Sequence, residues 1–380
     1  MFKEKMKSLC REILLLSILY LAIGVLLEVV FHILPVHEGM GWLPVNEENP
    51  IRRFEPNRSF IWSENWNFCL VNHLKSNNYG FISTIDYVPS SNIPLTAVIG
   101  DSFIEAAMVD QTRTVVAQLN AEFHGKRRFY AFATSGAQMS SYLSFAKYAK
   151  KKFHPDHYVF LLVGNDFDES LSSYGVEAGY HYFVRNPAGG LTLKRVDYEI
   201  GLLKEILRKS ALFMYINMNM QFRSRLNLVW KHIKNTISGW NPEYIGQTNA
   251  SADPRREADC KMAVDKFFEM LEDACGVSRK NILIGIDGMR PQLYEAENLR
   301  KANGSFFSHM REYVLFKTHE LGYPVIDMQP VFVQDYAINK QFFEYPQYND
   351  GHWNERAHGL FAHQIIESGF MNRMRNLITN

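Results

Sequence analysis

Short apolar runs that alternate with amphipathic stretches dominate the sequence after residue 94. Five such runs, at residues 95–100, 127–134, 157–164, 281–287 and 323–328, predict buried strands. Apolar positions at helical spacing predict helices over residues 113–123, 138–152, 256–275, 305–321 and 355–368. Strands that alternate with helices indicate an α/β fold, a three-layer sandwich whose central parallel sheet carries helices on both faces. The strand order we expect is the flavodoxin-like 2-1-3-4-5.

A longer apolar stretch covers residues 13–34 near the N-terminus. As a helix its 22 residues would extend about 33 Å, enough to cross a bilayer. Four basic residues precede it: Lys3, Lys5, Lys7 and Arg11. The positive-inside tendency therefore predicts that residues 1–12 are cytoplasmic and that the rest of the chain is exported across a bacterial inner membrane.

Two other interpretations of residues 13–34 stay open. One is a cleaved signal peptide, although the stretch is longer than the usual apolar region and no A-x-A-like cleavage site follows it. The other is a buried core helix, because Glu28 and His32 would be costly in the middle of a membrane. Both residues lie toward the exported end, where an interfacial position relieves most of that cost.

The remaining chain divides into a lead-in of residues 35–94 and one large domain of residues 95–380. An insertion at residues 167–254, with helical patterning over residues 198–237, interrupts this domain. Because the insertion follows the third strand directly, we expect it to overhang the edge of the sheet and to select the substrate. Its aromatic residues Tyr180, Tyr182 and Phe183 are candidates for stacking on a sugar ring, although aromatic residues are also common in cores.

Composition narrows the possible partners. The chain has 380 residues, of which 47% are hydrophobic, so it can bury a full core. Its 41 basic and 40 acidic residues nearly cancel, which argues against nucleic acid as a partner. Four cysteines are too few for a disulfide framework. Cys260 and Cys275 lie too far apart on one predicted helix to pair, whereas a disulfide from Cys69 to either one stays open.

The ends of the predicted strands carry the candidate chemistry. The first strand ends in Gly-Asp-Ser, which places Ser102 at the carboxyl edge of the sheet. Gly136 follows the second strand, Asn165 follows the third, and Asp350 and His352 stand just before the last helix. A serine hydroxyl needs a base and a group that orients this base. His352 is the candidate base and Asp350 the candidate orienting acid.

These four segments, in this order, resemble the GDSL or SGNH hydrolase superfamily over residues 77–368. The resemblance implies an acyl-enzyme on Ser102 and no cofactor. It also implies an oxyanion hole formed by the N–H groups of Ser102 and Gly136 and by the side chain of Asn165. Much of the superfamily separates the last acid and histidine by two residues, but only Gly351 separates them here. That spacing resembles the membrane-associated, polysaccharide-modifying subgroup that includes the alginate O-acetylation proteins.

The resemblance leads us to expect a serine esterase or acetyltransferase that acts on ester-linked acyl groups, acetyl above all, of an envelope or exported polysaccharide. Expected partners are the acylated carbohydrate, the inner membrane, and a membrane acyltransferase or glycan-assembly machinery. Whether water or a sugar hydroxyl resolves the acyl-enzyme stays open. The alternative is a polysaccharide-binding or assembly component without catalytic activity.

A metal site is a further alternative, because the C-terminal segment supplies the right kinds of ligand. The candidates are Asp350, His352, His358 and His363. We expect no metal, because His358 and His363 are five residues apart on one predicted helix and so do not share a face.

Overall fold

The computed structural model describes residues 2–222, 225–226, 243–345 and 351–370. The chain forms two compact units, one of residues 1–40, 60–73 and 200–238 and the other of residues 41–59, 74–199 and 239–380. The predicted lead-in and the predicted insertion are therefore each divided between the two units.

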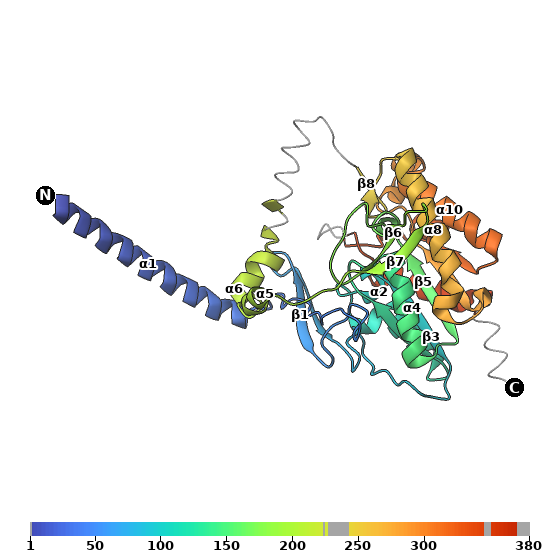
Figure 1. Cartoon of the computed structure of the whole chain (residues 1–380), viewed down its shortest axis with the longest axis horizontal. Coiled ribbons are helices and arrows are strands. Elements are labelled where there is room, and N and C mark those ends of the chain that lie inside the picture. Colours follow the sequence, from blue (N-terminus) through green and yellow to red (C-terminus); the bar gives the residue numbers. More distant parts are fainter. Residues whose placement is uncertain (1, 223–224, 227–242, 346–350, 371–380) are drawn as a thin grey trace. The chain divides into compact units, whose positions relative to one another are not determined.

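A five-stranded parallel sheet forms the centre of the second unit (Figure 1). Its strands are β3 (Leu95–Gly100), β4 (Arg128–Ala133), β5 (His157–Leu162), β10 (Ile282–Ile286) and β11 (Val325–Asp327). They lie in the order β11-β10-β5-β3-β4, which is 2-1-3-4-5 when these five strands are counted along the chain. The predicted fold class and strand order are confirmed, and each predicted strand matches an observed one to within about two residues at either end.

Each strand of the sheet sends alternate side chains to opposite faces, as the two-residue period requires. On β3, Ala97 and Ile99 join one core cluster, whereas Val98 joins the other. The first cluster is completed by α4 (Met139–Phe153), α8 (Pro254–Cys275) and α10 (Phe306–Leu321). The second cluster is completed by α3 (Val115–Phe123), α11 (Met328–Asn339) and α12 (Glu355–Glu367). Strands buried on both faces explain the continuous apolar runs in the sequence.

Several short elements of this unit are absent from the sequence prediction. They are α2 (Ser102–Glu105), α9 (Ala296–Ala302), α11, and the antiparallel hairpins β6 (His181–Arg185) with β7 (Leu191–Arg195) and β8 (Tyr244–Ile245) with β9 (Thr248–Asn249). The two hairpins lie within the insertion that the sequence predicts as mostly helical. Except for α11, which has 12 residues, these elements are two to seven residues long and carry too little periodicity to be recognised in a sequence.

The first unit contains α1 (Phe2–Ile33), most of the two-stranded sheet of β1 (Ser59–Glu64) and β2 (Leu70–Lys75), α5 (Leu202–Leu207) and α6 (Ala211–Met214). Within α1, the 30 residues Glu4–Ile33 include an 18-residue stretch with a mean hydropathy of 2.7, and none of this stretch is buried. Length and composition suit a membrane span and equally a signal sequence. All four cysteines are free, so Cys69 forms no disulfide.

Candidate active site

Ser102 lies where β3 passes into α2. Asp101 caps this short helix, because its carboxylate accepts a hydrogen bond of 2.9 Å from the Phe103 N–H. A Cβ at Gly100 would come within 2.5 Å of Ile104, so the tight passage from strand to helix requires glycine. In the sheet β3 lies between β4 and β5, so the chain changes direction across the sheet at this strand. Ser102 therefore stands at the topological switch point, where open α/β sheets bind ligands.

His352 meets Ser102 across 250 residues of sequence. Its Nε2 lies 2.8 Å from the Ser102 Oγ. With the ring proton on Nδ1, the serine hydroxyl donates to Nε2, which is the arrangement of a nucleophile and its general base. The sequence analysis predicts this pair, and the structure brings the two residues together. Asp350, the predicted orienting acid, lies outside the described residues.

A buried ionic cluster holds the segment around His352. The next residue, Trp353, is fully buried, and its indole N–H donates to the Asp287 Oδ1 at 2.8 Å. Asp287 follows β10, and its Oδ2 accepts a 2.6 Å hydrogen bond from the Arg290 Nη2. Both charges of this pair are buried, so each needs the other. The carboxyl end of β10 thus anchors His352 beside the end of β3.

Two side chains donate hydrogen bonds to the backbone carbonyl of Gly351, the residue before His352. The Gly351 oxygen accepts hydrogen bonds from the Arg290 Nη1 at 3.1 Å and from the Gln247 Nε2 at 2.9 Å. Gln247 lies in the turn of the β8–β9 hairpin, next to Gly246. Neither Arg290 nor Gln247 could be predicted from the sequence, because the separation of 104 positions between Gln247 and Gly351 leaves no local signal.

The same hairpin also contacts the segment after β5. A Cβ on Gly164 would come within 1.9 Å of the Gly246 carbonyl oxygen. Gly246 has φ +60 and its own Cβ would lie 2.2 Å from the Phe307 ring, so only glycine fits there. The β8–β9 turn therefore connects the segment of Asn165 with the segment of His352.

Gly136 lies in a tight turn after β4. The Ala137 N–H donates to the Thr134 carbonyl at 3.0 Å, and Gly136 has φ +80 at the third position, as a type II turn requires. The Tyr180 hydroxyl donates to the Ser135 carbonyl. Because the C=O and N–H of one trans peptide point in opposite directions, Tyr180 sets the direction of the Gly136 N–H. This N–H is one of the predicted oxyanion donors.

Glu105 holds the same turn from the other side. Its carboxylate accepts hydrogen bonds from the Ser135 N–H and, at 3.0 Å, from the Ser135 hydroxyl. The side chain is buried, and this burial raises the pKa of Glu105 to about 7. Glu105 is not among the residues predicted from the sequence, although an acid within the otherwise apolar residues 103–109 is a signal that could have identified it.

Asn165 lies in a 3-10 turn, Gly164–Asp166, after β5. Its amide donates to Glu169 at 3.0 Å, a bond that uses one of the two amide N–H groups. The neighbouring Asp166 is fully buried and accepts hydrogen bonds of 2.8 Å each from the Tyr142 hydroxyl and the Val163 N–H. Burial raises the pKa of Asp166 well above its ordinary value. Asp166 thus holds the turn that presents Asn165.

The three aromatic residues predicted to bind a sugar are instead part of the core. Tyr180, Tyr182 and Phe183 are 1%, 5% and 0% exposed and belong to the cluster around α4. Tyr182 and Phe183 lie on β6, which packs against α4, and Tyr180 directly precedes this strand. Buried rings cannot stack on a sugar. Tyr180 contributes to the site through its hydroxyl.

The C-terminal histidines do not converge. His358 is fully buried, and its Nδ1 accepts a 3.3 Å hydrogen bond from the Val115 N–H. Burial lowers the pKa of His358 to about 3. His363 is exposed on another face of α12. Among the residues that the structure describes, no three His, Cys, Asp or Glu side chains lie close enough to hold a metal ion.

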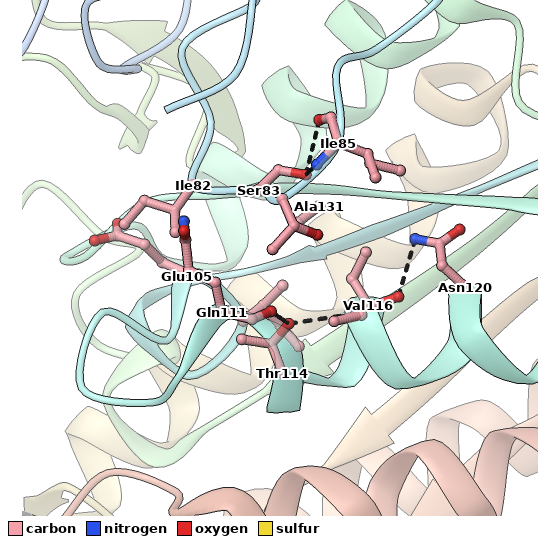
Figure 2. Close-up of a pocket in the computed structure, with 12 residues that line it drawn as sticks. Ile82, Ser83, Ile85, Glu105, Gln111, Thr114, Val116, Asn120 and Ala131 are labelled. Atoms are coloured by element: carbon pink, nitrogen blue, oxygen red, sulfur yellow. Dashed lines mark hydrogen bonds between the residues drawn. The ribbon is translucent and has the colours of Figure 1, made fainter. Parts of the chain in front are cut away.

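A small cavity lies beside α2 and α3 (Figure 2). Its lining includes Glu105, Thr114 and Asn120, together with residues of the loop before β3. Neither Ser102 nor His352 lines it, and its volume is about 20 Å³, room for roughly one water molecule. The cavity is therefore too small to hold a substrate.

Neither a protein-family model nor a curated protein sequence matches the chain. Three solved structures illustrate what it is similar to. A member of the lipolytic G-D-S-L family from Veillonella parvula has 12% identity, covers 72% of this chain and 97% of its own, and gives a TM-score of 0.36. A lipase from a goat rumen metagenome has 12% identity over 73% and 98% of the two chains, with a TM-score of 0.38. A two-domain esterase active on acetylated mannans has 9% identity over 74% and 50%, with a TM-score of 0.34.

Proposed function

We propose that the protein is a serine esterase or acyltransferase of the SGNH type. The observation that carries the proposal is the 2.8 Å contact between the Ser102 Oγ and the His352 Nε2 at the carboxyl edge of the sheet. The donors that such a reaction needs follow the neighbouring strands β4 and β5, where Gly136 and Asn165 lie. Support also comes from the buried contacts that hold each of these segments in place.

The reaction we propose begins with attack of the Ser102 Oγ on an ester carbonyl carbon, while the hydroxyl proton passes to the His352 Nε2. The N–H groups of Ser102 and Gly136 and the Asn165 amide stabilise the oxyanion of the tetrahedral intermediate. The first residue of a helix has no intrahelical partner for its N–H, which leaves the Ser102 N–H available for this task. His352 then returns the proton to the leaving alkoxide, and the acyl group stays on Ser102.

Asp350 is proposed to orient His352 through its Nδ1, as in other serine triads. Water or a sugar hydroxyl then releases the acyl group, which gives hydrolysis or transfer. No step of this reaction uses a cofactor.

The substrate we propose is an acetylated polysaccharide of the cell envelope or one that is exported through it. The single-residue spacing between Asp350 and His352, which resembles the polysaccharide-modifying subgroup, supports this substrate. We further propose that α1 anchors the protein in a bacterial inner membrane, with the catalytic unit exported, because basic residues precede the apolar stretch. A membrane acyltransferase or glycan-assembly machinery is the proposed protein partner.

A fluorophosphonate probe tests the proposed nucleophile. The detergent-solubilised full chain should gain one adduct by intact mass, located on Ser102, and should hydrolyse an activated acetyl ester. Ser102→Ala should abolish both, whereas Ser173→Ala, at an exposed position, should change neither. Labelling that persists in Ser102→Ala would place the nucleophile elsewhere. A wild-type chain that neither labels nor turns over would instead favour the carbohydrate-binding alternative.

An acceptor oligosaccharide distinguishes hydrolysis from transfer. The acetyl ester is supplied with and without the oligosaccharide, and the products are examined by mass spectrometry. An oligosaccharide that gains the mass of an acetyl group identifies a transferase. Release of acetate alone, at the same rate with and without the acceptor, identifies an esterase.

A further inference from the structure

The exported end of α1 is tied to the segment of residues 202–215 by specific contacts within the first unit. The Glu28 carboxylate accepts three hydrogen bonds, from the Ser210 hydroxyl at 2.8 Å, the Ala211 N–H at 2.8 Å and the Leu212 N–H at 3.0 Å. One turn further along α1, the Phe31 ring stacks on Tyr215 with 4.1 Å between ring centroids. The end of α1 is thus bound into a folded unit, which a removable leader does not need.

These contacts explain how the Glu28 carboxylate can lie inside the hydrocarbon core of a membrane. Residues 13–27 form an uncharged stretch that, as a helix, covers only about 22 Å, less than the hydrocarbon core of roughly 30 Å. A helix that starts to cross at residue 13 therefore reaches the outer boundary of the core only after Glu28. An unsatisfied carboxylate is costly there, and the N-terminal donors of α6 satisfy it. The N-terminus of α6 must then lie at the same depth as Glu28.

The helix just before this contact presents an apolar face to the exterior. On α5, Leu202, Leu203 and Ile206 are 74%, 70% and 57% exposed. The three residues lie one, three and four positions apart, so they share one side of the helix. Only Arg208 and Lys209 separate α5 from Ser210, the first of Glu28's partners, so this apolar face stays close to the end of α1.

Other side chains near the end of α1 suit the same environment. Tyr215, which stacks on Phe31, also donates to the carbonyl of Trp66, whose side chain is 63% exposed. Tryptophan is enriched at membrane interfaces because its ring is amphipathic. Arg208 and Lys209 follow α5 directly and supply positive charge for lipid phosphates.

From these observations we propose that α5 is an interfacial helix. It lies in the outer surface of the bilayer beside the end of α1, with Leu202, Leu203 and Ile206 among the acyl chains. The hydrogen bonds of Glu28 to residues 210–212 hold α5 beside α1, and we call Glu28 its tether. The proposal rests on the proposed membrane anchoring by α1, but not on the proposed chemistry at Ser102. Lipid is the occupant we assign to this face, because the face lies close to the end of α1, whose apolar window has no buried residue.

Depth-dependent quenching in lipid nanodiscs tests the proposal on the full chain. In a Cys10→Ser, Cys69→Ser background the remaining cysteines, Cys260 and Cys275, are buried. A bimane label is placed at Leu203→Cys, and the nanodiscs contain phosphatidylcholine and phosphatidylglycerol with or without doxyl-labelled lipid. The label should lose fluorescence when doxyl lipid is present.

Two further positions calibrate this measurement. Leu19→Cys, within α1, is the positive control, and Ile338→Cys, 73% exposed on α11 of the other unit, is the control for exposed apolar positions. Quenching at residue 19 without quenching at residue 203 would overturn the proposal. A label at residue 203 that is shielded from an aqueous quencher but not affected by doxyl lipid would assign the face to a protein contact, which also overturns it.

Glu28→Leu tests the tether. This change leaves α1 at least as apolar, so quenching at residue 19 should persist, but quenching at residue 203 should decrease because the start of α6 loses its three hydrogen bonds to α1. Unchanged quenching at residue 203 would refute the role of Glu28.

Intact mass of the purified full chain tests whether α1 stays attached as a membrane anchor, which the interfacial helix requires. A chain that begins after residue 34 would overturn the interfacial helix and the anchor together. Fluorophosphonate labelling of Ser102 remains a separate measurement, so a failure here leaves the proposed chemistry standing.

Discussion

Replacement of Glu105 by glutamine should change how the stability of the protein depends on pH. Glutamine keeps the shape of the side chain, and its carbonyl oxygen can still accept from the Ser135 N–H, but it cannot ionise. In the wild-type protein, burial raises the pKa of Glu105 from 4.5 to about 7. The folded state therefore holds this proton more tightly than the unfolded state does, and the free energy of unfolding depends on whether the proton is present.

The sign and size of the effect follow from that difference. Below about pH 4.5 both states carry the proton, and the carboxyl group makes no pH-dependent contribution. Between pH 4.5 and about 7 the unfolded state loses its proton first, so the wild-type free energy of unfolding falls relative to that of Glu105→Gln. At 1.36 kcal/mol per pKa unit the total fall is roughly 3 kcal/mol. Above pH 7 the difference between the two proteins should be constant.

Thermal unfolding of the detergent-solubilised full chain, followed by tryptophan fluorescence, measures this difference. Between about pH 5 and pH 8, the melting temperature of Glu105→Gln should rise relative to wild type by roughly 5 °C or more. Other titrating groups are common to both proteins and largely cancel in the comparison. Glu122→Gln, at an exposed position on α3, reports what the loss of one negative charge does by itself. A constant difference between wild type and Glu105→Gln over this range would refute the assignment of a raised pKa to Glu105.

Substitutions at four positions test the proposed catalytic groups and the side chains that hold their segments, each with an activated acetyl ester as substrate. Gln247→Met removes one of the two donors to the Gly351 carbonyl, so kcat should fall roughly 3-fold to 10-fold while the melting temperature stays unchanged. An unchanged kcat would mean that the other donor suffices. Tyr180→Phe frees the peptide that carries the Gly136 N–H, so kcat should fall roughly 10-fold with little change in KM, and a change in KM alone would contradict a role at the oxyanion. His352→Ala should reduce turnover by several orders of magnitude and Asp350→Asn by roughly 10⁴-fold. If Asp350→Asn and Asp350→Ala both stay near wild-type activity in a folded protein, another acid orients the base.

The sequence alone determined the sheet and the positions of the candidate site residues. Each strand is a run of apolar residues buried on both faces, and each helix carries its own period, so both can be recognised within one short window. Ser102 and His352, which the structure brings within 2.8 Å, could be predicted because one follows a strand end and the other precedes a helix, whereas the roles of Gly136 and Asn165 stay predictions that the family resemblance implies. The switch point of a parallel sheet brings such ends together whatever the intervening sequence.

The tertiary structure alone decided what holds these groups in place. Glu105 and Tyr180 reach the Ser135 turn across 30 and 45 residues, and Gln247 reaches Gly351 across 104. The tertiary structure also contradicts the expectation that Tyr180 stacks on a sugar. Its ring lies in the core, and its hydroxyl donates to the Ser135 carbonyl in the turn. No local pattern records such pairs, because the hydrogen bonds form only after two separate segments pack against each other and exclude water. Burial then raises the pKa of Glu105 and makes each of these polar partners necessary.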